Sequence, residues 1–107
     1  MKNSFKVMLN KQIIYTYTDK AAPARLRRFL DEMDKDMQTG IKLGDDSVEN
    51  PSDFQKLQYV AVQLFHALQM NDKNLAEVMS AYLMKRNNQL SLINITQTND
   101  VFNIQLT

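Results

Sequence analysis

The chain has 107 residues, a length that predicts one domain, and its 44% hydrophobic and 23% charged residues are ordinary for a soluble globular protein. Cysteine is absent, which excludes disulfides, thiolate metal sites and cysteine nucleophiles and favours a reducing, cytoplasmic compartment. The chain has no run of about 18 apolar residues and no apolar N-terminal stretch, so neither a membrane helix nor a secretion signal is expected.

The net charge of +1 hides a segregation of charge along the chain. Residues 1–30 carry seven basic side chains and one acid, residues 31–53 carry eight acids and two bases, and residues 54–107 carry four bases and three acids. These segments therefore have net charges of +6, −6 and +1. They create local electric fields unless folding brings the opposite charges together.

The N-terminal segment is expected to form a β-hairpin. Phe5, Val7 and Leu9 recur at the period of two that is typical of a half-buried strand. The stretch QIIYTYT, residues 12–18, is rich in the β-branched and aromatic residues that strands favour. Asn10 with Lys11 would form the turn, although lysine is a poor residue for its second position.

A first helix is expected over residues 22–38. Pro23 suits its first turn, and Gly40 suits the left-handed position just past its end. Residues 40–50, which contain both glycines of the chain, are then expected to form a loop. The residues that recur at helical spacing and predict the buried stripe are Leu26, Phe29, Leu30, Met33 and Met37.

Two more helices are expected in the centre of the chain. The second begins in the stretch NPSDFQ, with Asn50 as its cap and Pro51 at its first position. The third follows a turn capped by Asn71 or Asp72, and it ends near the stretch KRNNQ. Helical spacing predicts that one stripe of the second helix faces the core. This stripe consists of Phe54, Leu57, Ala61, Leu64, Phe65 and Leu68.

The C-terminal segment is expected to form another hairpin, with residues 90–97 and 101–107 on either side of the turn TND. The expected order is therefore two strands, three helices and two strands. Strands and helices that are grouped rather than alternating predict an α+β domain. We expect the two hairpins to form one antiparallel sheet with the three central helices packed on it.

The cluster of acids in the first helix does not have the ligand spacing of a calcium site. An EF-hand loop that starts at Asp34 would need glycine at its sixth position and glutamate at its twelfth, where this chain has Thr39 and Asp45. The helical stripe instead predicts that these acids lie on the solvated side of the helix. No metal site is expected, and the acidic loop Asp45–Glu49 would bind a cation only weakly. The clustered acids are Asp31, Glu32, Asp34 and Asp36.

The residue content gives little support to catalysis or to a cofactor. His66 is the sole histidine, and no carboxylate or nucleophile close in sequence would complete a catalytic pair with it. With two glycines in the chain, a glycine-rich phosphate cradle is excluded, and none of the standard catalytic motifs occurs. We therefore expect a protein that is not an enzyme and that needs no cofactor, and an enzyme whose site the sequence does not identify is the less favoured alternative.

Two basic pairs support an alternative hypothesis, in which the protein is a nucleic-acid-binding regulator. Arg25 and Arg28 belong to the first helix, and Lys85 and Arg86 lie at the end of the third. The pI of about 7.9 is low for a domain that binds nucleic acid by charge. We therefore expect no measurable binding at physiological salt concentration.

One side of the second helix favours a protein interface. The residues on this side lie away from the core stripe of the helix, and they are unusually weakly polar for a solvated face. Tyrosine, which is one of them, is enriched at interface centres. Lys56 and Gln63 would form the rim, and a homodimer is the simplest assembly. The sequence thus predicts a small, non-enzymatic protein-interaction or regulatory module. The predicted contact residues are Gln55, Tyr59, Val62 and His66.

Overall fold

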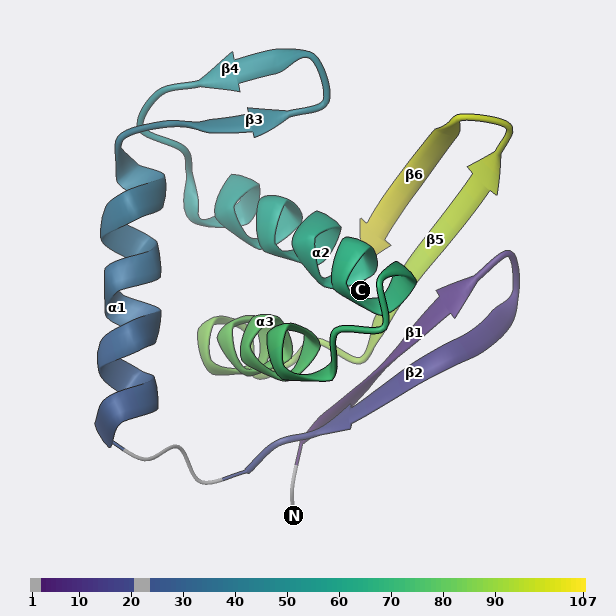
Figure 1. The fold of residues 1–107 in the computed structure, drawn as a ribbon, viewed down its shortest axis with the longest axis horizontal. Helices are drawn as coiled ribbons and strands as arrows, with labels where there is room; N and C mark the ends of the chain where they lie inside the picture. The colour runs from purple at the N-terminus through teal and green to yellow at the C-terminus, as the bar shows by residue number, and fades with distance from the viewer. Residues whose placement is uncertain (1–2, 21–23) are drawn as a thin grey trace.

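A computed structural model describes residues 3–20 and 24–107, and both terminal hairpins lie where the sequence predicts them (Figure 1). Pro23 and the predicted start of the first helix fall outside the described residues. In chain order the elements are β1 (Ser4–Leu9), β2 (Gln12–Thr18), α1 (Ala24–Gln38), β3 (Ile41–Leu43), β4 (Asp46–Val48), α2 (Asp53–Gln69), α3 (Lys73–Arg86), β5 (Leu92–Thr98) and β6 (Val101–Leu106).

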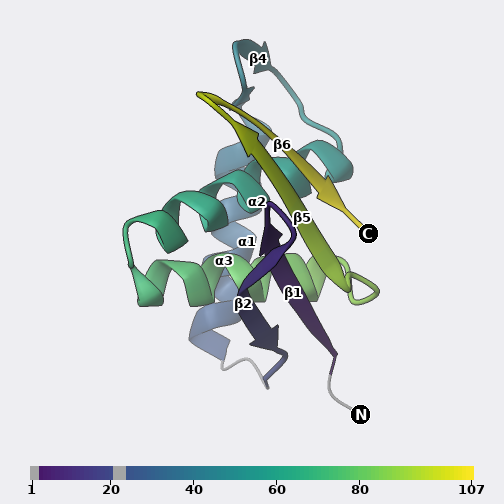
Figure 2. The same cartoon turned by 90° about the vertical axis from the view of Figure 1, so that its right-hand side faces the viewer.

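The two terminal hairpins share one four-stranded sheet in the order β2-β1-β5-β6, which confirms the predicted α+β architecture (Figure 2). The expectation of a purely antiparallel sheet was wrong, because the central strands β1 and β5 are parallel. Backbone hydrogen bonds also link the two ends of this pairing, from Lys6 N to Ser91 O (3.1 Å) and from Asn10 N to Ile95 O (2.9 Å). Each hairpin is antiparallel by itself, so the strand pattern alone does not determine the direction in which two hairpins meet.

The turn of the first hairpin has a conformation that its sequence only half predicts. Asn10 and Lys11 both have positive φ, 48° and 72°, as the tight turn between twisted strands requires. Lysine is unfavourable there, but the Asn10 side chain accepts a hydrogen bond from the backbone N–H of Gln97 at 2.9 Å. This bond links the turn to β5 and helps to hold it in place.

The predicted loop over residues 40–50 contains a third hairpin, formed by β3 and β4, which the sequence analysis missed. Gly44, with φ of 63°, makes its turn, and Ile41 pairs with Val48. Ile41 is buried and belongs to the hydrophobic core. Strands of three residues are too short to show a clear alternation, which explains the miss.

The N-termini of α2 and α3 follow local capping rules, but the start of α2 differs from the prediction. The N-cap of α2 is Ser52 rather than Asn50, and its first helical residue is Asp53 rather than Pro51. Ser52 Oγ accepts from Gln55 N at 3.2 Å, and Gln55 Oε1 accepts from Ser52 N at 2.9 Å, which is a capping box. At the start of α3, Asp72 is the cap, as the sequence suggested.

The core lies between the sheet and the pair formed by α2 and α3. From the sheet it contains Phe5, Val7, Ile93 and Ile95, and from the helices it contains Val60, Leu64, Phe65, Tyr82, Leu83 and Met84. The predicted stripes were partly wrong, because Phe29 is 47% exposed and Phe54 is 58% exposed. Helix α1 lies to one side of the helix pair rather than on the sheet (Figure 1). It buries only Leu30 and Met37, so its contact stripe is narrower than its apolar pattern.

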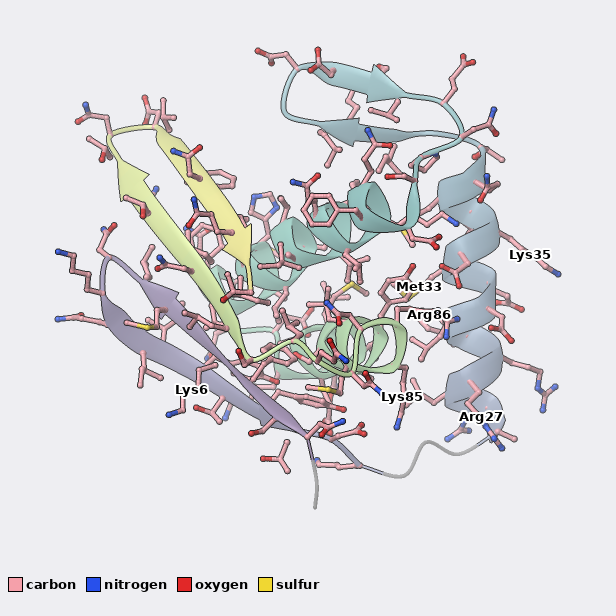
Figure 3. All side chains as sticks on the ribbon, turned by 180° about the vertical axis from the view of Figure 1, so that it is seen from behind. Lys6, Arg27, Met33, Lys35, Lys85 and Arg86 are labelled. Carbon is pink, nitrogen blue, oxygen red and sulfur yellow. The ribbon has the colours of Figure 1, made fainter. Side chains whose placement is uncertain are left out.

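A polar cluster joins α1 to α3. Asp34 accepts hydrogen bonds from the Tyr82 hydroxyl and from Arg86 Nε (2.9 Å), and the Arg86 guanidinium also bonds Asp31 at 3.1 Å. Figure 3 shows Arg86 between α3 and α1. Asp34 is therefore only half-exposed, which corrects the prediction that all the acids of this helix are on its solvated side. Burial, and then the bond to Asp34, raises the pKa of Tyr82 well above its usual value.

Replacing Asp34 by Asn should lower the free energy of unfolding by about 1–2 kcal/mol, because it weakens a half-buried, charge-assisted pair. The control Asp31→Asn removes a carboxylate that is 70% exposed and contacts the same arginine. It should cost less than about 0.5 kcal/mol, as exposed ion pairs do. Urea unfolding of both variants tests this, and equal losses would contradict the role assigned to Asp34.

Candidate functional site

A groove of about 780 Å³ lies between strand β2 and the ends of α2 and α3. Residues 14–18 of β2 form one wall. Phe65 and Leu68 of α2, the turn residue Asn71 and Ala76 of α3 contribute to the opposite side. In Figure 2 the α2–α3 turn extends sideways beyond β2 as an overhang, and residues of this turn and of both helices line the groove.

The groove follows the edge of the strand rather than one of its faces. In a strand, successive side chains point to opposite sides of the sheet. Every residue from Ile14 to Thr18 lines the groove, so side chains of both orientations border it. Because β2 is the outermost strand on its side of the sheet, the groove opens onto its free backbone edge.

The hydrogen-bond register shows which backbone groups are at that edge. Asp19 N donates to Asn3 O at 2.7 Å, and these residues continue the direct register in which Ser4 faces Thr18. Opposed residues of an antiparallel pair alternate between bonded and non-bonded pairs. Tyr17 and Tyr15 are therefore in bonded pairs with β1. The backbone N–H and C=O groups of Thr16 and Thr18 point away from β1, toward the groove.

The geometry on the other side of β1 agrees with this assignment. Lys6 lies opposite Thr16, and the backbone N–H of Lys6 donates to Ser91 at the start of β5. Because this N–H points toward β5, it cannot also bond Thr16. The alternation along β1 is therefore the same whether it is read from β2 or from β5.

The tyrosines of β2 anchor the strand beneath the helices. The Tyr17 ring packs against Phe5 with centroids 5.6 Å apart, and the Tyr15 hydroxyl accepts from Ser80 Oγ at 3.3 Å. Burial raises the pKa of Tyr17 to about 12, and the charges of Asp19 and Glu77 add to that rise. Both side chains thus serve the core, as alternating strand aromatics usually do, and fix the position of the edge.

The usable edge is bounded at both ends. A β-bulge between the pairs of Val7 and Met8 interrupts the register beside Ile14, which is 41% exposed. At the other end, Lys20 pairs with Glu77 at 2.8 Å and Asp19 pairs with Lys85 at 3.0 Å. Regular, uncharged edge backbone is therefore confined to residues 15–18.

The interface residues predicted from sequence share one side of α2. Gln55, Tyr59 and Val62 are half-buried and His66 is exposed. The His66 ring lies 6.3 Å from that of Phe102 in β6, so the sheet borders one end of this face. Tyr59 lines a smaller cavity, of about 280 Å³, which also contains residues of α1 and α3.

Lys56 was predicted to belong to the rim of that interface, and this was wrong. Lys56 is only 8% exposed, and its Nζ donates to Gln38 Oε1 at 2.8 Å. It thus ties α2 to the end of α1. Its apolar stem lies on the buried side of α2, as long charged side chains often do when their polar end finds a partner.

The four residues predicted to contact nucleic acid differ in whether they form ion pairs within the fold. Arg25 and Arg28 are exposed on α1. Lys85 and Arg86 instead bind acids, Lys85 with Asp19 and Arg86 with Asp31 and Asp34. Half of the predicted basic set is therefore already paired within the fold.

The groove does not include any of the site residues predicted from the sequence. A signal was present, since residues 12–18 contain neither charge nor proline, which is uncommon for an unprotected edge strand. That signal becomes visible only when the strand order is known. Among residues 3–20 and 24–107, no cluster of three metal-binding side chains occurs, and no helix is long and apolar enough to span a membrane.

Amide hydrogen exchange tests the assigned edge. The amides of Tyr15 and Tyr17 should be protected because they bond β1, whereas those of Thr16 and Thr18 should exchange much faster because they face solvent in the groove. Exchange of the free protein, followed by NMR at residue level, measures this alternation. Uniform protection along residues 15–18 would show that the edge is already covered.

Comparisons with known proteins identify no relative. No protein-family model matches the sequence, and no curated protein is significantly similar to it. No solved structure gives a significant match to the fold. The chemistry of the groove and of the other surfaces is therefore the basis for any inference about function.

Proposed function

We propose that this protein is a non-enzymatic protein-interaction module that binds another polypeptide in the groove beside β2. One observation carries the proposal: an uncharged edge strand presents outward-facing backbone groups to a groove of about 780 Å³. Natural proteins usually block such edges with charge, proline or a covering segment. An edge that is left open beside a groove of ligand-binding size supports a binding role.

The chemistry of the groove fits recognition better than catalysis. Its charged side chains, Lys20, Asp72, Lys73 and Glu77, sum to zero. Lys20 is paired with Glu77, and Asp72 caps α3 by accepting from Leu75 N at 3.1 Å. Lys20, Asp72 and Glu77 are thus occupied in structural contacts. His66, the residue best suited to proton transfer near neutral pH, has the rings of Phe65 and Phe102 as its neighbours.

A second surface supports the same class of function. The side of α2 that carries Tyr59, Val62 and His66 has no charged residue, because Lys56 is turned inward and Asp53 lies in the first turn. Interface centres are depleted of lysine, glutamate and aspartate. This face is a second candidate surface for contact with another chain, which includes a second copy of this protein in a homodimer.

A photo-crosslinking amino acid in place of Ile14 should capture specific polypeptides in cells that express the protein, because this position lines the groove. The matched control has the same amino acid in place of Lys35, which is exposed on α1 and points away from the helix pair (Figure 3). Mass spectrometry of the adducts identifies the captured chains. Equal yields and identical adducts at the two positions would argue against the groove as a binding site.

The substitution Val62→Glu tests the second surface separately. A charge in the centre of a real contact should weaken it at least about tenfold, while the half-buried position leaves the core intact. Light scattering measures any change in mass, and crosslinking from the Ile14 position shows whether groove binding is unaffected. A variant with unchanged mass and partners would exclude this face, provided that its circular dichroism matches the wild type.

A further inference from the structure

We infer that the groove binds a short, extended and uncharged peptide segment of a partner protein, which adds to the sheet as a fifth strand beside β2. This inference rests on the proposed function and specifies its mode. It names the occupant by chemistry: a lone strand that bonds the backbone of Thr16 and Thr18 and places alternate side chains beneath the helices. Strand addition of this kind obtains affinity from the main chain and specificity from the side-chain pockets.

The outward-facing backbone groups of β2 would form the hydrogen bonds to the added strand. Thr16 and Thr18 lie two positions apart and present their N–H and C=O groups to the same edge, which is the spacing at which an added strand forms its bonds. Tyr15 and Tyr17 alternate with them and are held against Ser80 and Phe5. The receiving edge is therefore fixed before a ligand arrives, which reduces the entropy cost of binding.

The overhang of the helices decides what kind of strand fits. Figure 2 shows that the α2–α3 turn projects past β2 on the helix side of the sheet, over the place where a fifth strand would lie. A single extended peptide can lie beneath it. A second copy that pairs antiparallel about a two-fold axis would bring its own α2 and α3 to the same side of the sheet, beside the first overhang. The geometry therefore favours a peptide over symmetric pairing of β2 with β2.

The side chains of the groove determine the composition of the peptide. Residues of the added strand that point toward the helices meet Leu68 and the small side chain of Ala76, which favours apolar groups there. Residues that point the other way lie beside the Thr16 and Thr18 side chains, which suits small polar groups. The charges at the groove are balanced, and Lys20 is already paired with Glu77. The groove therefore favours a peptide without net charge.

The length of the peptide is also limited. The bulge beside Ile14 bends the edge at one end, and the ion pairs of Asp19 and Lys20 occupy the other. Regular pairing is thus possible only along residues 15–18. A short segment is recognised, while the open-ended pairing that leads to aggregation is prevented.

The test uses random linear peptides displayed on phage and selected on the full chain. Selected peptides should be uncharged in their central positions, with apolar residues at every second position. Their binding, measured with labelled synthetic copies, should fall at least about tenfold in Thr16→Pro, which removes the outward N–H donor. Proline is tolerated at such edge positions, so the fold should survive. The matched control Thr16→Val keeps the N–H and the shape of the side chain, and it should bind like the wild type.

Amide exchange of the wild type gives a second readout that does not depend on the folding of a variant. On addition of a selected peptide, the Thr16 and Thr18 amides should become protected, while those of Tyr15 and Tyr17 are protected already. Failure to select peptides, equal binding by Thr16→Pro, or unchanged exchange at Thr16 and Thr18 would overturn the inference. A dimer that is lost in Thr16→Pro would overturn it in favour of self-pairing.

The outcomes also separate this inference from the proposed function. Specific adducts from the Ile14 position, together with binding that Thr16→Pro leaves unchanged, would keep the groove as a binding site and reject strand addition. Adducts that do not differ from those at Lys35 would reject the binding site itself. Specific adducts that disappear in Thr16→Pro and persist in Thr16→Val would support both.

Discussion

The parallel pairing of β1 with β5 is the contact on which the rest of the structure depends. It joins hairpins from opposite ends of the chain, with Val7 opposite Ile93 and Leu9 opposite Ile95. Without it there would be two separate hairpins, which are marginally stable in water, and no continuous surface for α2 and α3 to cover. The same pairing makes β2 and β6 the outer strands, so it also creates the exposed edge at which binding is proposed.

Much of the fold could be predicted because its patterns are local. The terminal hairpins, the capping of α3 and the buried stripe of α2 from Ala61 to Phe65 follow from residue spacing and turn chemistry. The β1–β5 direction and the partial burial of Asp34 could not be predicted in this way. They depend on contacts between residues far apart in sequence, such as Asp34 with Tyr82 and Arg86, which periodicity does not encode.

At the Asp34 cluster, acids of residues 31–53 pair with a base of residues 54–107 and not with the basic residues 1–30. The acid-rich segment meets Arg86 of α3, and Asp19 meets Lys85, so acids and bases distant in sequence become neighbours. These pairs hold α1 and the end of β2 against α3. Lys85 and Arg86, two of the four residues that suggested nucleic-acid binding, thus form ion pairs within the fold, whereas Arg25 and Arg28 are exposed.

The candidate site was harder to predict than the fold, because an edge is a property of the sheet and not of its strand. The stretch QIIYTYT would suit an interior strand equally well, since both positions require β-branched and aromatic residues. The opposite edge, β6, is also uncharged, yet its apolar residues Phe102, Ile104 and Leu106 are packed against the core. Of the two edges, β2 alone lines the large groove and lies beneath the overhang of the α2–α3 turn. The combination of free backbone, a covered space and balanced charge therefore distinguishes β2 from β6, although their sequences are similarly free of charge. Because β6 is uncharged too, the composition of β2 does not by itself account for the proposed site, which also requires the groove between β2 and the α2–α3 turn.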